Sequence, residues 1–189
     1  TAASTGLNEK QARAAGVAYD KVVTYSASHA SYYPGARNMT VKTLFDPASG
    51  RILGAQIVGF DGVDKRMDVL AAAIRAGLTA EQLTELDLAY APPYGSAKDP
   101  VNMAGYVIEN VRAGLVEQHH WDAVAELPAD GSVILLDVRT PGEVRKQGLL
   151  RSDALHIPLD ELRGRLGELD KGKKIYVNCY SGLRSYLAC

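Results

Sequence analysis

Apolar and polar residues in the first 60 positions follow the pattern of half-buried β-strands. Three runs rich in β-branched and aromatic residues occupy positions 19–28, 39–45 and 51–60. The segment 46–50, of sequence DPASG, lies between the second and third runs and has the composition of a tight turn. This succession predicts a meander of antiparallel strands.

Helical signals accompany these strands. Residues 8–11 and 79–82 have the form of capping boxes, which predicts a helix after each. Apolar residues recur at helical spacing over 63–76, and Gly77 supplies a stop. The dipeptide Asp99-Pro100 predicts the start of a further helix. The first half is therefore predicted to be an α+β domain, in which helices cover an antiparallel sheet.

After Leu115 the pattern changes to short apolar strands that alternate with helical segments. The predicted strands occupy residues 133–138, 155–158 and 174–178, and the predicted helices occupy residues 121–127, 141–147 and 160–169. Such alternation is typical of a parallel α/β sheet.

Composition narrows the class of protein. The chain has 189 residues, of which 47% are hydrophobic and 23% charged, with a net charge of −1; this suits one large or two small globular domains. The basic residues are scattered, so we expect neither nucleic acid nor a membrane as a partner. Two cysteines without a pairing framework, and no apolar stretch of about eighteen residues, indicate a cytoplasmic protein. Because the chain begins at Thr1 rather than Met, we expect a piece of a larger protein.

The most chemically informative segment is residues 175–185. A hydrophobic run leads into Cys179, and the loop that follows consists of Tyr180, Ser181, Gly182, Leu183 and Arg184. Backbone N–H groups at such a turn, together with a permanent positive charge, favour a thiolate over a thiol. The alternative is a small buried core cysteine. The glycine and the arginine of the loop favour a reactive cysteine.

Together with the segment 135–143, of sequence LLDVRTPGE, this loop resembles the active-site region of rhodanese domains. In that family the loop cysteine takes up sulfane sulfur, holds it as a persulfide and passes it to an acceptor. The resemblance implies this role for Cys179, with Arg184 as a catalytic residue and Tyr180 to Leu183 as the loop around the persulfide. Four residues separate Cys179 from Arg184, one fewer than in related cysteine phosphatases, which suits sulfur better than a tetrahedral oxyanion.

Other residues of this half have a structural interpretation. We expect Asp137 and Arg139 to form a pair that ties the strand end to neighbouring backbone, the alternative being a direct catalytic role. We expect His156 to be structural too. Rhodanese domains continue past the loop through a full helix and another strand, so the resemblance implies a domain that is incomplete at its C-terminus. Cys189 is expected to be a core residue of that helix, the alternative being a resolving thiol for Cys179.

The first half resembles the dimerisation domain of FAD-dependent pyridine nucleotide-disulfide oxidoreductases. The resemblance rests on residues 29–35, of sequence HASYYPG, and on residues 90–103, of sequence YAPPYGSAKDPVNM. The coenzyme A-disulfide reductase branch is the most similar, and some of its members carry a fused rhodanese domain in this order. The resemblance implies FAD and NAD(P)H in the intact parent. No Gly-x-Gly-x-x-Gly follows a strand here, so we expect no cofactor and no metal on this chain.

In that family the dimerisation domain reaches across a two-fold axis to complete the partner's active site. This implies a homodimer through residues 1–116 and two tyrosines directed at a substrate thiolate, which we place at Tyr32 and Tyr90. A phenol donates a hydrogen bond to a thiolate without being charged itself. The alternative role is interface packing. The neighbouring candidates are Tyr33, Tyr94 and Lys98, the last for contact with an anionic substrate.

These expectations combine into one hypothesis. The chain is the C-terminal part of a flavin-dependent NAD(P)H disulfide or persulfide reductase, with an α+β dimerisation domain at residues 1–116 and a truncated α/β rhodanese-like domain at residues 117–189. Its substrates would be small thiols, disulfides or persulfides such as coenzyme A derivatives, and the isolated chain is expected to be inactive. Two alternatives stay open: a structural dimerisation and regulatory module without its own activity, and part of an NADH oxidase.

Overall fold

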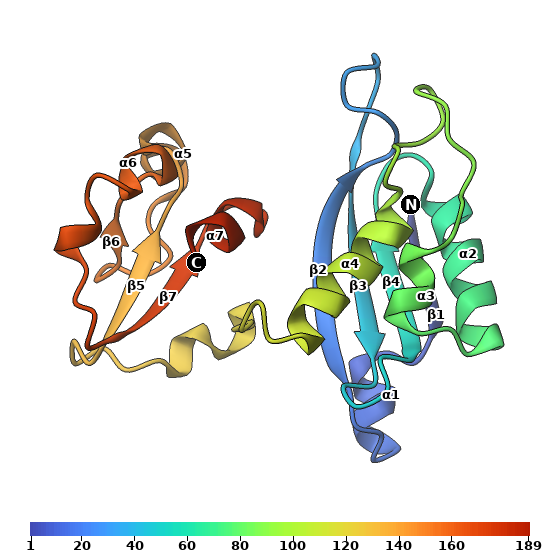
Figure 1. Ribbon diagram of the computed structural model, residues 1–189, viewed down its shortest axis with the longest axis horizontal. Coiled ribbons are helices and arrows are strands. Elements are labelled where there is room, and N and C mark those ends of the chain that lie inside the picture. Colours follow the sequence, from blue (N-terminus) through green and yellow to red (C-terminus); the bar gives the residue numbers. More distant parts are fainter. The chain divides into compact units, whose positions relative to one another are not determined.

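The computed structural model describes residues 1–189, which form two compact units. A four-stranded antiparallel sheet forms the centre of the first unit, Thr1–Leu115 (Figure 1). The strands are β1 (Ala2–Gly6), β2 (Asp20–Ala27), β3 (Asn38–Phe45) and β4 (Ile52–Val58), in the order β1-β4-β3-β2. The predicted antiparallel meander of three strands is thus confirmed. Strand β1 was not predicted, because its small and polar residues show no apolar alternation. Its pairing with β4, in which Ala2 lies opposite Val58, defines it instead.

The helices of this unit begin and end where local signals place them. They are α1 (Glu9–Ala14), α2 (Val63–Ala76), α3 (Ala80–Thr84) and α4 (Pro100–Arg112). The capping boxes that begin α1, α3 and α4 are all formed. Gly77 ends α2 with a φ of 74°, a left-handed conformation that favours glycine.

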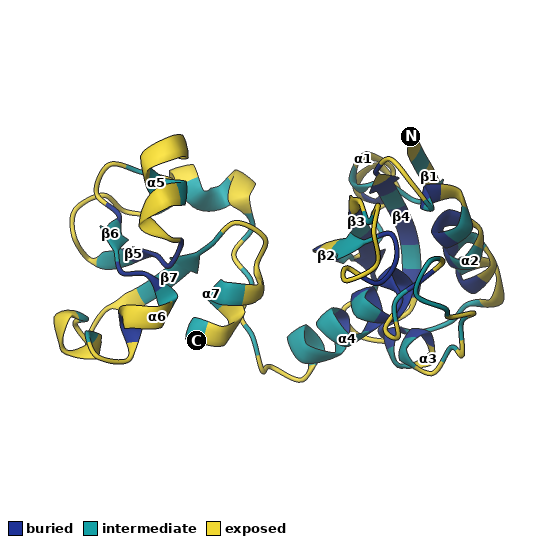
Figure 2. Cartoon of the chain, turned by 90° about the horizontal axis from the view of Figure 1, so that it is seen from above, coloured by how far each residue is buried: buried dark blue, intermediate teal, exposed yellow.

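Helices α2, α3 and α4 cover one face of the sheet (Figure 1). Side chains of the strands and of these helices share one apolar core, which includes Val41, Ile57, Leu70, Leu83 and Ile108. Figure 2 shows the corresponding concentration of buried residues between sheet and helices. The opposite face of the sheet carries exposed apolar side chains, among them Tyr25 and Val58. The burial pattern therefore follows the strand alternation, one face in and one face out.

The second unit, Val116–Cys189, contains a parallel three-stranded sheet in the order β6-β5-β7. Its strands are β5 (Val133–Asp137), β6 (Leu155–His156) and β7 (Lys174–Asn178); its α-helices are α5 (Pro141–Gln147), α6 (Leu159–Leu162) and α7 (Leu183–Ala188); its 3₁₀ helices are η1 (Trp121–Glu126) and η2 (Leu166–Glu168). The predicted parallel α/β arrangement is confirmed.

The prediction of one continuous helix over residues 160–169 is wrong. The chain forms the single turn α6, with Arg163 as its C-terminal cap, and then the separate 3₁₀ turn η2. Gly164 and Gly167 lie in this stretch, and glycine costs about 1 kcal/mol relative to alanine inside a helix. Of all the helices in both units, none has the length and apolar character needed to cross a membrane.

Candidate functional site

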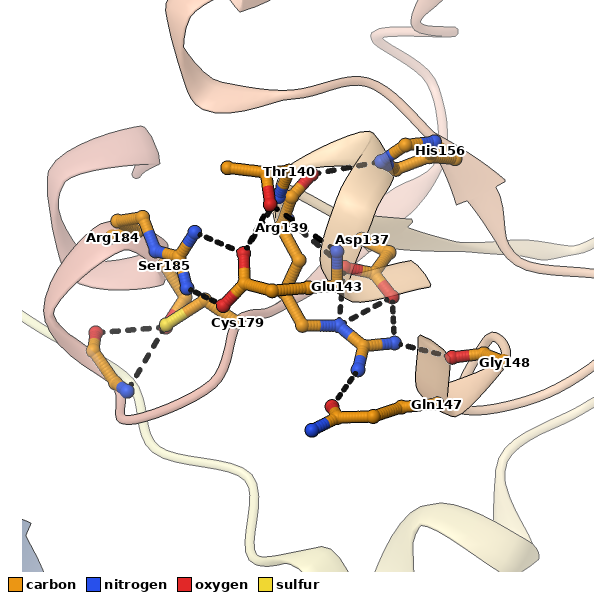
Figure 3. A network of polar contacts seen from close by, with 11 residues as sticks. Asp137, Arg139, Thr140, Glu143, Gln147, Gly148, His156, Cys179, Arg184 and Ser185 are labelled. Atoms are coloured by element: carbon orange, nitrogen blue, oxygen red, sulfur yellow. Dashed lines mark hydrogen bonds and ion pairs between the residues drawn. The ribbon is translucent and has the colours of Figure 1, made fainter. Parts of the chain in front are cut away.

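Strand β7 delivers Cys179 to the carboxyl edge of the parallel sheet, where the chain turns into α7. Gly182 makes that turn with a φ of 97°, and its backbone N–H donates a hydrogen bond to Cys179 Sγ at 3.0 Å. Ser185 Oγ lies 3.6 Å from the same sulfur and 2.8 Å from the carbonyl oxygen of Gly182 (Figure 3). Its single hydroxyl proton is donated to that carbonyl or, once Cys179 is a thiolate, to the sulfur. The loop therefore surrounds the sulfur with hydrogen-bond donors.

These donors determine the acidity of the thiol. Burial of the sulfur acts to raise the pKa of Cys179, but hydrogen bonds from the Ser185 side chain and from the backbone of Ser185, Ser181 and Gly182 outweigh it, so the pKa lies below the ordinary thiol value. Donors that face the sulfur stabilise the charged form. Cys179 accordingly has a larger thiolate fraction at neutral pH than a free cysteine does.

Arg184 lies beside this sulfur and is held by a carboxylate from another element. Its Nη1 and Nη2 donate to Oε2 and Oε1 of Glu143 on α5, both at 2.7 Å (Figure 3). The carboxylate of Glu143 is the main reason that the pKa of Arg184 is raised, and attraction to the Cys179 sulfur adds to it. In turn Glu143 accepts hydrogen bonds from the backbone N–H and the hydroxyl of Thr140, at 2.9 and 2.7 Å. The pKa of Glu143 is strongly lowered, principally by Arg184.

Asp137 and Arg139 form a buried ion pair at the end of β5. Nη2 of Arg139 donates to Asp137 Oδ2 at 2.6 Å and to the carbonyl of Gly148 at 2.7 Å, and Nη1 donates to Gln147 Oε1 at 2.9 Å. The pair therefore ties the end of β5 to the end of α5. His156 Nε2 lies 2.8 Å from the carbonyl oxygen of Arg139. The structural interpretation of these residues is confirmed.

The remaining loop residues are open to solvent. Tyr180 and Leu183 are 63% and 65% exposed, and Ser181 and Gly182 are exposed as well. Cys179 itself is of intermediate burial, so the cysteine is partly accessible beside these exposed neighbours.

The prediction that Cys189 is a core residue is wrong. Cys189 is exposed, and it is Ala188 that packs against the core of this unit. The cysteine follows Ala188, the last residue of α7.

Tyr32 and Tyr90 come together in the first unit. Their hydroxyl oxygens lie 3.0 Å apart, although 58 positions separate them in the sequence, and the two residues are 75% and 49% exposed. The hydrogen bond that Tyr32 shares with Tyr90 is the main reason that the pKa of Tyr32 is raised. Tyr33, in contrast, contacts the ring of His29 edge-on, with 5.9 Å between the two ring centroids.

Lys98 and Tyr94 contact other residues than Tyr32 and Tyr90. The ammonium group of Lys98 is 4.7 Å from the ring centroid of Tyr106. Tyr94 is 74% exposed, and its backbone carbonyl accepts a hydrogen bond from Lys65 at 3.4 Å.

A buried arginine that the sequence did not single out anchors the two tyrosine loops. Arg66 of α2 is 2% exposed. Its Nη2 donates to Asp99 Oδ2 and to the carbonyl of Ser28, both at 2.8 Å. Ser28 begins the loop that contains Tyr32, and Asp99 ends the loop that contains Tyr90. A further hydrogen bond, from Ala30 N to Gly95 O at 2.8 Å, joins the loops directly.

Sequence reasoning also missed the contribution of Glu143 and Ser185 to the cysteine loop. Glu143 shows a local signal, since it stands three residues after Thr140 in a capping box. That signal explains the start of α5 but not the contact with Arg184, which is 41 positions away.

The two units correspond to two known families. Residues 1–100 match the pyridine nucleotide-disulphide oxidoreductase dimerisation domain. The chain belongs to this family. Residues 120–189 match the rhodanese-like domain. The resemblances of both halves, and the fold class that they implied, are thereby confirmed.

Proteins that resemble this chain combine the same two parts. It is 48% identical to reduced CoADR-RHD from Bacillus anthracis, with a TM-score of 0.94, over 99% of this chain and 33% of that one. It is 42% identical to a NAD-dependent persulfide reductase from A. fulgidus, with a TM-score of 0.85 and the same coverage. It is 49% identical to coenzyme A disulfide reductase from Staphylococcus haemolyticus over 88 residues, or 20% of that relative. The chain thus spans between one fifth and one third of these proteins.

The family implies FAD and NAD(P)H in the parent protein. In the second unit, parallel strands turn into helices at residues 138–140 and 179–182. Neither turn has the repeated glycines that let backbone approach a dinucleotide pyrophosphate. These turns do not fit a dinucleotide.

Proposed function

We propose that this chain is part of a flavin-dependent NAD(P)H disulfide or persulfide reductase of the coenzyme A disulfide reductase type. Its second unit would supply Cys179 as a carrier of sulfane sulfur. The observation that carries the proposal is the partly accessible thiol of Cys179, with a lowered pKa, in a loop with Arg184. Relatives named coenzyme A disulfide reductase and persulfide reductase support the reaction class.

The geometry supports sulfur transfer in two displacements. The Cys179 thiolate attacks the sulfane sulfur of a donor, so a new S–S bond forms and the bond between that sulfur and the donor breaks. The donor group leaves with the electron pair, and Cys179 is left as a persulfide. A nucleophilic acceptor then attacks the outer sulfur, and Cys179 returns as the thiolate. The hydrogen bonds from Gly182 N and Ser185 favour the anionic sulfur at the start and at the end of this cycle.

The first unit is proposed to form a homodimer through residues 1–116, and Tyr32 and Tyr90 to face a substrate thiolate in the partner's site. Two hydroxyls at 3.0 Å share one hydrogen bond, in which one O–H is the donor. The second O–H is then free to donate to an external anion. Small thiols, disulfides and persulfides such as coenzyme A derivatives are the substrates proposed, and the cytoplasm, where free thiols persist, is the compartment proposed.

Sulfur loading of Cys179 tests this proposal. The protein that contains this chain is incubated with an organic persulfide or with thiosulfate, and persulfide is measured by mass spectrometry of the Cys179 peptide and by thiocyanate release with cyanide. We expect loading in the native protein and loss to background in Cys179→Ser. Cys189→Ser is the matched control and should load normally.

Loading that persists in Cys179→Ser, or a native protein that forms no persulfide with either donor, would contradict the proposal. The second result would favour the alternative of a structural module without activity of its own. The other alternative, an NADH oxidase, is represented by a water-forming NADH oxidase from Lactobacillus brevis at 22% identity and a TM-score of 0.57, a likeness that shows the fold alone.

A further inference from the structure

The two hydrogen bonds from Arg184 to Glu143 occupy both terminal nitrogens of the guanidinium group. Both terminal nitrogens donate to the carboxylate at 2.7 Å, which is the bidentate geometry that arginine otherwise offers to phosphate, sulfate and similar oxyanions. An oxyanion in this loop would have to displace Glu143 or use the remaining N–H groups. Glu143 therefore occupies the position of a bidentate oxyanion ligand.

The carboxylate is fixed in this position by its own element. Thr140 donates to it through the backbone N–H and the hydroxyl, and both residues belong to the capping box of α5. Arg139, the other arginine whose charge acts on Glu143, donates to Asp137, Gln147 and Gly148. Its charge is balanced by the buried carboxylate of Asp137.

The charges around the sulfur follow from these contacts. Arg184 is the cation beside Cys179, and Glu143 balances its charge. Once Cys179 is a thiolate, the group of Glu143, Arg184 and Cys179 has a net charge of about −1. A donor that carries two negative charges is repelled by this group more strongly than a donor that carries one or none.

We infer that Glu143 is a specificity-determining residue that makes the loop select singly charged or neutral organic persulfides over dianionic donors such as thiosulfate. The inference rests on the proposed function of Cys179. With an organic persulfide, the Cys179 thiolate takes the outer sulfur and an organic thiolate leaves with the electron pair. With thiosulfate, the same displacement releases sulfite. Thiosulfate as it approaches and sulfite as it leaves each carry two negative charges beside Glu143. Neither transfer needs an external oxidant or reductant.

Glu143→Gln tests the inference, because glutamine keeps the shape of the side chain and is accepted at this position of a capping box. The rate constant for persulfide formation on Cys179 is measured with thiosulfate and with cysteine persulfide in the protein that contains this chain. We expect the ratio of the two, thiosulfate over cysteine persulfide, to rise about tenfold, as removal of one charge several ångströms away predicts. Because both rate constants come from one preparation, any misfolded fraction cancels in the ratio.

Two further variants complete the test. Glu143→Ala removes the same charge and should raise the ratio as well. Glu161→Gln, which removes an exposed carboxylate of α6 that pairs with Arg165, should leave it unchanged. If Glu143→Gln and Glu143→Ala change both rate constants by the same factor, Glu143 only positions Arg184 and the inference is overturned. That result differs from failure of the proposed function, in which the native protein forms no persulfide on Cys179 with either donor.

Discussion

At the scale of single residues, the lowered pKa of Cys179 depends on the hydrogen-bond donors around its sulfur, and one of these donors is the side chain of Ser185. The hydroxyl of Ser185 is the largest of the contributions that lower the pKa of this thiol. We expect Ser185→Ala to raise the pKa of Cys179, so that the rate of its alkylation by iodoacetamide reaches half of its plateau at a higher pH. The measurement is the pH dependence of alkylation, followed by mass spectrometry of the Cys179 peptide.

The same experiment contains its own comparisons. Ser181→Ala should leave the pH midpoint unchanged, because Ser181 acts on the sulfur through its backbone N–H. Cys189 should react with a higher midpoint than Cys179, since partial shielding of its sulfur raises its pKa. Equal midpoints for the two cysteines would show that the loop does not activate Cys179.

At the scale of elements, the ion pair between Arg66 and Asp99 joins α2 to the residue that caps the start of α4. Arg66 also donates to the carbonyl of Ser28, which follows β2. Arg66 and Asp99 are both buried, at 2% and 3% exposure, and Asp99 also caps α4 by accepting from Val101 N at 3.1 Å. Removal of one partner leaves a buried charge without compensation, which costs about 3–5 kcal/mol. Arg66→Met should therefore lower the free energy of unfolding of the first unit by about 3 kcal/mol, measured by urea denaturation.

Arg75→Met is the matched control on the same helix. Arg75 is exposed, so its replacement should change the free energy of unfolding by less than about 0.5 kcal/mol. The double variant with Arg66→Met and Asp99→Asn should recover part of the loss, since it no longer buries a lone carboxylate. If Arg66→Met unfolds at the urea concentration of the native protein, the pair does not hold the tyrosine loops.

At the scale of the whole molecule, family membership implies dimerisation, and the first unit exposes aromatic side chains that suit an interface. Tyr25, Tyr32, Phe60 and Tyr94 are all at least half exposed. We expect a homodimer at micromolar concentration, measured by sedimentation velocity over a dilution series. A monomer at every concentration would contradict it, and would also remove the basis for placing Tyr32 and Tyr90 in a partner's site.

Much of the fold was predictable because its signals act within a few residues. The capping boxes of α1 and α3, the Asp99-Pro100 start of α4 and the glycine stop of α2 were read from residues adjacent in sequence. The pair of Asp137 and Arg139, two positions apart, was predicted for the same reason. Strand β1 and the break after α6 were not predicted. The first depends on a distant partner strand, and in the second two glycines outweighed an otherwise helical pattern.

The sequence by itself determined the two fold classes and placed Cys179 in a loop that follows a strand; the reactivity of Cys179 and, through family resemblance, the roles of Tyr32 and Tyr90 stay predictions. Only the tertiary structure decided which groups meet: Arg184 with Glu143, Tyr32 with Tyr90, and Arg66 with Asp99, which lie 41, 58 and 33 positions apart. Propensity and capping act over one or two turns of the chain. Contacts between distant side chains depend instead on how helices and strands pack, and in this protein those contacts determine how each part of the candidate site is held.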